Sequence, residues 1–283
     1  LKTTGPFVLE TGSVVPDSIY GATQGVYLNV AKKGDPEFTI SKENGPKNLC
    51  VTTGYTAPYG KKIRVPKNAI AQAYPMEAYP DSKLHILDKT ARTITEIQYI
   101  VDVSVNPVLT AALQFLAFFN IGKGAGGLQC HGVTVYSLDD NSMEATVEGS
   151  TAARLPLTEL QMRYDDALVG NSQLMGLVAK MPRKGKYVAP ARSSDGPSEH
   201  DDAIWMGHIL KLTDEGYRYL MSRHKHIPVL ATIICSWWMY GIVVFDTGGH
   251  NSTPLEPDAR WPQEELEALA KDITWDDFEV WVQ

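Results

Sequence analysis

The sequence contains few cysteines, little positive charge and no long apolar run. Lysine and arginine total 26 against 33 acidic residues, which gives a formal net charge of −7 at pH 7. Because a nucleic-acid backbone is bound by clustered basic residues, this balance argues against a nucleic-acid partner. No run of about 18 uncharged apolar residues occurs, so we also expect no membrane span.

The three cysteines, Cys50, Cys130 and Cys235, have no C-x-x-C spacing, which argues against a zinc site. Cys235 lies in an apolar stretch, where a buried free thiol is expected. Cys50 and Cys130 leave two alternatives open, namely one disulfide bond in a secreted protein or two free thiols. No motif predicts a cofactor or a catalytic metal, and paired acidic residues leave a structural calcium ion as an option.

Turn residues and aromatic rings are abundant, with 23 glycines, 17 prolines, 13 tyrosines and 6 tryptophans. Short β-prone segments separated by such turn residues are typical of an all-β fold with long loops. A chain of 283 residues allows one large domain or two modest ones. Because no internal repeat or clean linker divides it, we expect a single β-rich domain over residues 1–283, with 1–80 as its loop-rich N-terminal part.

Hydrophobic patterning predicts the main elements. A hairpin is expected where strands 84–88 and 93–99 flank a four-residue turn. Helices are expected at 107–121, at about 226–240 and from Pro262 onward, where proline and acidic residues open the first turn. Further strands are expected at 25–30, 62–65, 131–138, 173–180, 206–212, 241–245 and 275–282.

Four stretches over roughly residues 80–282 carry a resemblance to a group of proteins. In chain order they are residues 81–88 with Glu96, residues 153–157 with 162–166, residues 187–192, and residues 240–249 with Arg260-Trp261 and 277–280. Together they resemble an uncharacterised family of secreted, mostly bacterial β-rich proteins. The resemblance implies a secreted protein with a compact jelly-roll or concanavalin-like β-sandwich of carbohydrate-active type, on which a few helices pack.

This chain departs from the family pattern at two places. A histidine expected after Tyr164-Asp165 is replaced around Gln173-Leu174-Met175, and another expected after Pro190-Ala191-Arg192 is replaced by Ser193-Ser194. If those histidines are catalytic in the relatives, this chain works differently or does not perform that reaction. The family has no settled activity, so the resemblance bears on the fold more than on chemistry.

His85 and Glu96 lie on adjacent strands of the expected hairpin and are candidates for an acid/base pair. A carboxylate beside an imidazole serves this purpose because each group shifts the pKa of the other toward neutrality. In this hypothesis Glu96 is the principal carboxylate, and His85 orients or protonates. The alternative is a polar cross-strand pair on a solvated face.

Two further acidic positions are candidates for the second carboxylate of a glycoside hydrolase. Asp246 ends an apolar strand before a glycine-rich loop, where a rigid element would hold it, and an Asx turn explains it equally well. Asp165 is followed by Asp166 in an expected turn, where helix capping and calcium binding are the alternatives.

A lyase that abstracts a proton next to a uronic-acid carboxylate is a close variant of the hydrolase. In that reaction His85 or Tyr164 would be the base, and Arg154 or Arg192 would neutralise the acid group. The negative net charge disfavours an acidic polymer unless a local basic cleft outweighs it.

Trp205 and Trp261 lie near polar loops and are candidates for stacking on sugar rings, although aromatic side chains more often belong to a core. The leading hypothesis is thus a secreted polysaccharide-degrading enzyme that uses carboxylate acid/base catalysis. The rival hypothesis is a non-catalytic carbohydrate-binding or surface-interaction protein. The enzyme requires a cleft with at least two titratable groups in reach of each other, and the binding protein requires exposed aromatic residues along a shallow face.

His224 and His226 form one more candidate pair. In an extended segment their imidazoles would share one face, as two ligands of a metal ion do. No third ligand is identifiable, so the sequence favours a solvated basic patch formed with Arg218 and Arg223.

Overall fold

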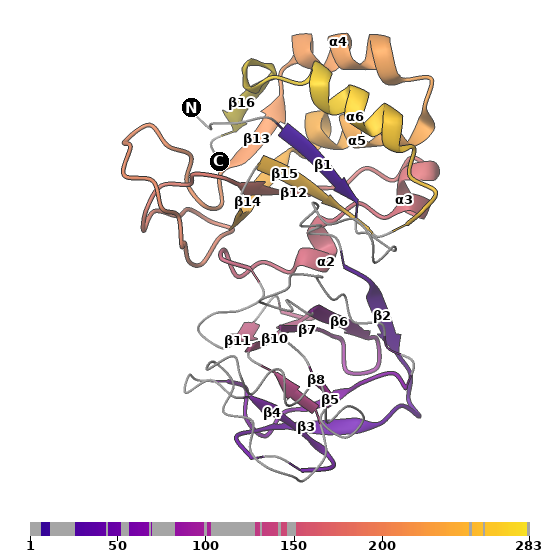
Figure 1. The fold of residues 1–283 in the computed structure, drawn as a ribbon, viewed down its shortest axis with the longest axis vertical. Coiled ribbons are helices and arrows are strands. Elements are labelled where there is room, and N and C mark those ends of the chain that lie inside the picture. The colour runs from indigo at the N-terminus through magenta and orange to yellow at the C-terminus, as the bar shows by residue number, and fades with distance from the viewer. Residues whose placement is uncertain are drawn as a thin grey trace. The chain divides into compact units, whose positions relative to one another are not determined.

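The computed structural model describes residues 7–11, 26–43, 45–51, 57–67, 69, 83–98, 101–102, 128–130, 132–140, 143–145, 151–248, 251–256 and 258–281. The chain divides into two compact units (Figure 1). Residues 1–25 and 151–283 form the first, named here the mixed unit, and residues 26–150 form the second, named the β unit. In sequence, the β unit therefore interrupts the mixed unit.

The mixed unit is built on a six-stranded sheet in the order β1-β15-β12-β14-β13-β16. Strands β1 and β15 are parallel, as are β12 and β14, whereas β13 is antiparallel to both β14 and β16. Every residue of β12 is buried, as is typical of a central strand covered on both faces. The strands are β1 (Phe7–Thr11), β12 (Met175–Ala179), β13 (Ile209–Leu212), β14 (Ile242–Thr247), β15 (Asn251–Leu255) and β16 (Phe278–Trp281).

Helices α4, α5 and α6 lie together beside this sheet (Figure 1). Helix α4 begins after Thr213, whose hydroxyl accepts a hydrogen bond from the N–H of Gly216 at 3.1 Å. Helix α5 is apolar, and its Trp237 packs against Phe278 of β16 with ring centroids 6.2 Å apart. No helix in the described ranges is long and apolar enough to cross a membrane. The helices are α2 (Leu157–Leu160), α3 (Tyr164–Leu168), α4 (Asp214–His224), α5 (Pro228–Met239) and α6 (Gln263–Asp272).

The β unit contains two five-stranded sheets, in the orders β11-β10-β7-β6-β2 and β5-β3-β4-β9-β8. Apolar side chains of both sheets, such as Ile86, Val133 and Leu49, belong to one buried cluster. The two sheets therefore enclose a common core. The strands are β2 (Leu28–Ala31), β3 (Glu37–Ser41), β4 (Asn48–Val51), β5 (Lys62–Arg64), β6 (Lys83–Asp88), β7 (Thr93–Gln98), β8 (Val101–Asp102), β9 (Leu128–Cys130), β10 (Gly132–Ser137) and β11 (Met143–Ala145).

The expected fold is confirmed only in part, because β-sheets dominate the architecture of the described residues but do not form the expected sandwich. Three separate mixed sheets occur together with helices, so the described part of the chain is a mixed α/β structure, and it shows no closed or jelly-roll sandwich. The predicted hairpin is confirmed by β6 and β7, which pair in antiparallel register across the turn at 89–92. Helix α4 was not predicted. The helix expected at 107–121 lies outside the described residues, and the single domain remains a prediction.

All three cysteines are free thiols. Cys50 and Cys130 lie on the neighbouring strands β4 and β9, but the register pairs Cys130 with Val51. Because successive side chains alternate between the faces of a strand, Cys50 and Cys130 point to opposite sides of the sheet. Burial raises the pKa of both thiols, which favours their neutral form. Cys235 is half-buried, so its expected full burial is wrong.

Candidate functional site

The predicted pair of His85 and Glu96 forms in the β unit, but it is closed off from solvent. The two residues are register partners on β6 and β7, with Nδ1 of His85 3.3 Å from Oε1 of Glu96. The hydroxyl of Tyr136 donates a hydrogen bond to Oε2 of Glu96 at 3.4 Å. Both His85 and Glu96 are 0% exposed, so neither the solvated face nor an open catalytic cleft describes this pair.

Three other predicted residues lie where loops meet the end of β14. Oδ1 of Asp246 accepts hydrogen bonds from the N–H of Ala152 and from the N–H of the next residue, each at 3.0 Å. The N–H of Arg192 donates to the carbonyl of residue 153, next to Arg154. Asp246 thus fastens a loop to the sheet. It does not form the expected Asx turn, because the N–H two residues on, that of Gly248, donates to the carbonyl of Ala179.

A further cluster joins Tyr164, Asp165 and Trp261. The rings of Tyr164 and Trp261 meet edge to face with centroids 5.1 Å apart. The guanidinium of Arg260 lies 4.3 Å from the centroid of Tyr164 and forms an ion pair with Asp165 at 2.8 Å. Trp261 is only 2% exposed, so it belongs to the core, and its prediction as a surface platform for sugars is wrong.

The predicted carboxylates are thus divided between the units. Glu96 lies with His85 in the β unit, whereas Asp165 and Asp246 lie in separate clusters of the mixed unit. Trp205 is half-buried in the mixed unit, where it stacks on a histidine ring. Within the described contacts, only His85 and Glu96 form a pair of predicted catalytic groups.

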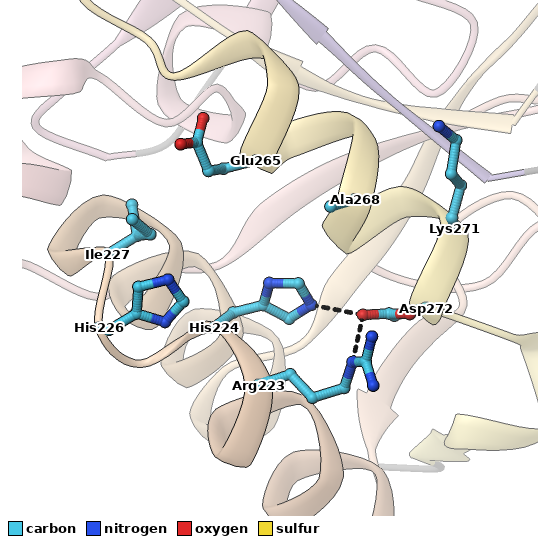
Figure 2. Close-up of a pocket in the computed structure, with 8 residues that line it drawn as sticks. All are labelled: Arg223, His224, His226, Ile227, Glu265, Ala268, Lys271 and Asp272. Atoms are coloured by element: carbon cyan, nitrogen blue, oxygen red, sulfur yellow. Dashed lines mark hydrogen bonds and ion pairs between the residues drawn. The ribbon is translucent and has the colours of Figure 1, made fainter.

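A different group of titratable residues lines a pocket of about 610 Å³ in the mixed unit (Figure 2). The pocket lies between the end of α4, the turn that follows it, and α6. Glu265, Ala268 and Asp272 follow one another at helical spacing on α6, and the short side chain of Ala268 leaves the space open. The titratable lining residues are Arg223, His224, His226, Glu265, Lys271 and Asp272.

His224 and Asp272 form a hydrogen-bonded pair in this pocket. Nε2 of His224 lies 2.8 Å from Oδ2 of Asp272, and Nε of Arg223 donates to the same oxygen at 2.6 Å. Partial burial raises the pKa of Asp272, but the hydrogen bonds from Arg223 and His224 outweigh it, so the pKa lies below its usual value. Asp272 is therefore an ionised carboxylate at neutral pH.

The ionised Asp272 determines which nitrogen of His224 carries the proton. A carboxylate only accepts hydrogen bonds, so Nε2 of His224 must donate, and in the neutral ring Nδ1 keeps its lone pair. Nδ1 makes no hydrogen bond within the described part of the chain. Figure 2 shows this second nitrogen on the side of the ring away from Asp272. The geometry therefore presents a base at the pocket.

The charges at the two ends of the pocket differ. Arg223 and Lys271 lie at the Asp272 end, and His226 and Glu265 lie at the other (Figure 2). The hydrogen bond to Asp272 raises the pKa of Arg223, which keeps the guanidinium charged. The pocket thus combines one base with fixed positive charge.

The sequence favours a solvated basic patch for His224 and His226, because it offers no third ligand for a metal pair on an extended segment. In the structure α4 ends at His224 and turns its ring toward Asp272, 48 residues later, while His226 is exposed in the following turn. The signal that predicts α4 was present, since an N-cap threonine precedes two acidic residues. The described residues contain no group of three or more His, Cys, Asp or Glu side chains that could hold a metal ion.

Comparison with protein families, with curated proteins and with solved structures finds no match to this chain. The resemblance to secreted bacterial β-rich proteins accordingly remains an expectation.

Proposed function

We propose that the chain is a secreted polysaccharide lyase that acts on a uronic-acid polymer, with His224 as the base. The observation that carries this proposal is the hydrogen bond between His224 and Asp272, which leaves the lone pair of Nδ1 at a pocket of about 610 Å³. An acidic substrate suits the positive charge of Arg223 and Lys271 at the same pocket. The secreted location rests on the family resemblance.

The composition of the pocket favours a lyase over a glycoside hydrolase. Hydrolysis of a glycosidic bond uses two carboxyl groups, one of them protonated as a general acid. Asp272 has a lowered pKa and is bound by Arg223 and His224, so it does not supply that proton. Among the described lining residues, Glu265 is then the one remaining carboxyl group. Proton abstraction next to a carboxylate requires a single base and a positive charge.

In the proposed reaction, Nδ1 of His224 removes the proton from the carbon beside the uronate carboxylate. Arg223 and Lys271 stabilise the negative charge that develops on that carboxylate. The electron pair of the broken C–H bond forms a carbon–carbon double bond as the neighbouring carbon–oxygen glycosidic bond breaks. The leaving oxygen takes a proton from the imidazolium or from water, which yields an unsaturated uronate and a new chain end.

Arg223 retains donors for the substrate in this scheme. Among the described contacts it uses its Nε–H on Asp272, and a guanidinium carries four more N–H groups. Its side chain is 53% exposed, so a polymer reaches it from solvent. Asp272 acts as a positioning residue, because it holds the proton on Nε2 and fixes the orientation of the ring.

The test is turnover on polygalacturonate, alginate and hyaluronan, measured by the ultraviolet absorbance of the unsaturated product. His224→Gln should lower kcat by about 100-fold or more, as the loss of a general base does. Asp272→Asn should lower kcat with little change in KM, because it alters the base rather than substrate binding. The matched control is Glu264→Gln, an exposed carboxylate on α6 that does not line the pocket. Full activity of His224→Gln, or no turnover on any polymer, would overturn the proposal.

A further inference from the structure

A second pocket of the mixed unit, about 340 Å³ in volume, lies beside β13 and β16. Ile209 and Trp281 line it and are register partners in these strands. Phe278, which packs on Trp237 of α5, lies three positions before Trp281 and therefore on the opposite face of the strand. Trp281 thus lies on the face of the sheet that α5 does not cover.

One wall of this pocket depends on a glycine. Gly207 has φ of +86°, and a Cβ atom there would lie 1.9 Å from the carbonyl oxygen of Val188. Without that atom the loop at Val188 and Ala189 packs closely on the start of β13, and the N–H of Val188 donates to the carbonyl of Met206 at 2.9 Å. The loop and the two strands together form a concave site.

Two lining residues of this pocket, Trp281 and His208, carry further ring and ammonium contacts beside it. Trp281 is 42% exposed, and Nζ of Lys211 lies 4.2 Å from its ring centroid. Trp205 stacks on His208 with centroids 5.5 Å apart, and Nζ of Lys186 lies 5.8 Å from the centroid of Trp205. The exposed indole of Trp281 provides a flat apolar face, and Lys211 adds positive charge beside it.

His208 supplies a directed donor at this pocket. The N–H of Trp205 donates to Nδ1 of His208 at 3.3 Å, so Nδ1 is unprotonated and Nε2 carries the hydrogen. Burial lowers the pKa of His208, which keeps the ring neutral at pH 7. The Nε2–H group makes no hydrogen bond within the described part of the chain, so a ligand oxygen is its natural acceptor.

We infer that this pocket binds one ring of an acidic sugar without cleaving it. The apolar face of the ring stacks on the indole of Trp281, a ring oxygen or hydroxyl accepts the hydrogen bond of His208, and the carboxylate lies near Lys211. The volume of 340 Å³ is at the lower end of the range of ligand pockets, which suits a single ring. Among the described residues, no carboxylate lines the pocket, so these residues lack the pair of groups needed for hydrolysis. The site is separate from the His224 pocket and requires no turnover there.

The test is calorimetric titration of the whole chain with trigalacturonate and with a neutral triglucoside. Trp281→Ala should weaken the binding of trigalacturonate by about tenfold, the worth of one stacked aromatic contact. Lys211→Gln should weaken the binding of trigalacturonate more than the binding of the neutral triglucoside. The matched control is Trp238→Ala, which removes another exposed indole, 38% exposed, at the end of α5.

The variant His224→Gln separates this inference from the proposed lyase activity. This variant should bind trigalacturonate at the Trp281 pocket with the same affinity as the wild type. Unchanged affinity of Trp281→Ala, or no binding of either oligosaccharide to the wild type, would overturn the inference. Binding that depends on Trp281, without turnover on any polymer, would instead support the pocket and contradict the lyase alone.

Discussion

The two units hold the same kind of residue pair in contrasting surroundings. In the β unit, His85 and Glu96 are paired at 3.3 Å, and both side chains are 0% exposed. In the mixed unit, His224 and Asp272 are paired at 2.8 Å at a pocket, with side chains 7% and 17% exposed. Proximity of an imidazole and a carboxylate therefore does not distinguish a structural pair from a catalytic candidate. Access of the pair to a pocket is what distinguishes the two cases.

The secondary structure explains this difference in access. His85 and Glu96 lie on β6 and β7, two inner strands of their sheet, and both side chains are fully buried. His224 and Asp272 are each the last residue of a helix, and a helix end must meet solvent, a cap or a ligand to satisfy its backbone groups. Polar side chains at helix ends are therefore placed where a substrate can reach them.

The chain carries separate natural reporters for the two units. The β unit contains no tryptophan, so tryptophan fluorescence follows the mixed unit alone. Cys50 and Cys130 are buried in the β unit, and with Cys235→Ser as background their reaction with a thiol reagent follows that unit. The six tryptophans of the mixed unit are Trp205, Trp237, Trp238, Trp261, Trp275 and Trp281.

The largest effect is expected from Trp237→Ala in the core of the mixed unit. Trp237 is 0% exposed and packs on Phe278, so its loss should lower the free energy of unfolding by about 4 kcal/mol. Denaturant unfolding followed by tryptophan fluorescence measures the change. In the same variant, Cys50 and Cys130 should keep their protection from the thiol reagent. If Cys50 and Cys130 lost their protection from the thiol reagent as well, the two units would not unfold separately.

A slightly smaller effect is expected from Glu96→Gln, which leaves His85 without its buried partner. Removing one member of a buried pair should destabilise the β unit by about 3 kcal/mol, because the remaining polar group stays desolvated. Thiol reactivity of Cys50 and Cys130 measures this change. The matched control is Asp139→Asn, which breaks the solvent-exposed pair with Arg92 and should cost less than about 0.5 kcal/mol. Equal costs would contradict the structural role of the His85–Glu96 pair.

The smallest effect concerns the response of Asp272 to acid. Its pKa in the folded chain lies below the value of about 3.9 expected in the unfolded chain. The ionised form therefore stabilises the mixed unit above about pH 4, and this contribution is lost as the pH falls through the lower, folded-state pKa. Because Arg223 is 53% exposed and water screens the pair, we expect a contribution of about 0.5 kcal/mol.

The measurement for Asp272 is urea unfolding at about pH 6 and about pH 3, followed by tryptophan fluorescence. The wild type should lose more stability between these two values than Asp272→Asn does. The control is Glu267→Gln on the same helix, which should keep the pH response of the wild type. If Asp272→Asn lost more stability than the wild type between these two pH values, the result would contradict the lowered pKa of Asp272.

The sequence predicted local features better than distant ones. The hairpin of β6 and β7 follows from two β-prone segments around one turn, and its register brings His85 opposite Glu96. Helix α4 escaped prediction because few apolar residues mark its inner face, chiefly Leu220, while its turns are mostly polar. The pairing of His224 with Asp272 spans 48 residues and depends on how α4 packs against α6, so no local pattern reveals it.

The sequence by itself determined the charge balance that argues against nucleic acid, the hairpin that pairs His85 with Glu96, and the proline and acidic start of α6. Only the tertiary structure decided which polar groups remain accessible. Burial depends on the elements that pack over a residue, and these come from distant parts of the chain. For that reason Glu96 is closed off in a sheet and Trp261 in a core, while His224 and Trp281 line pockets.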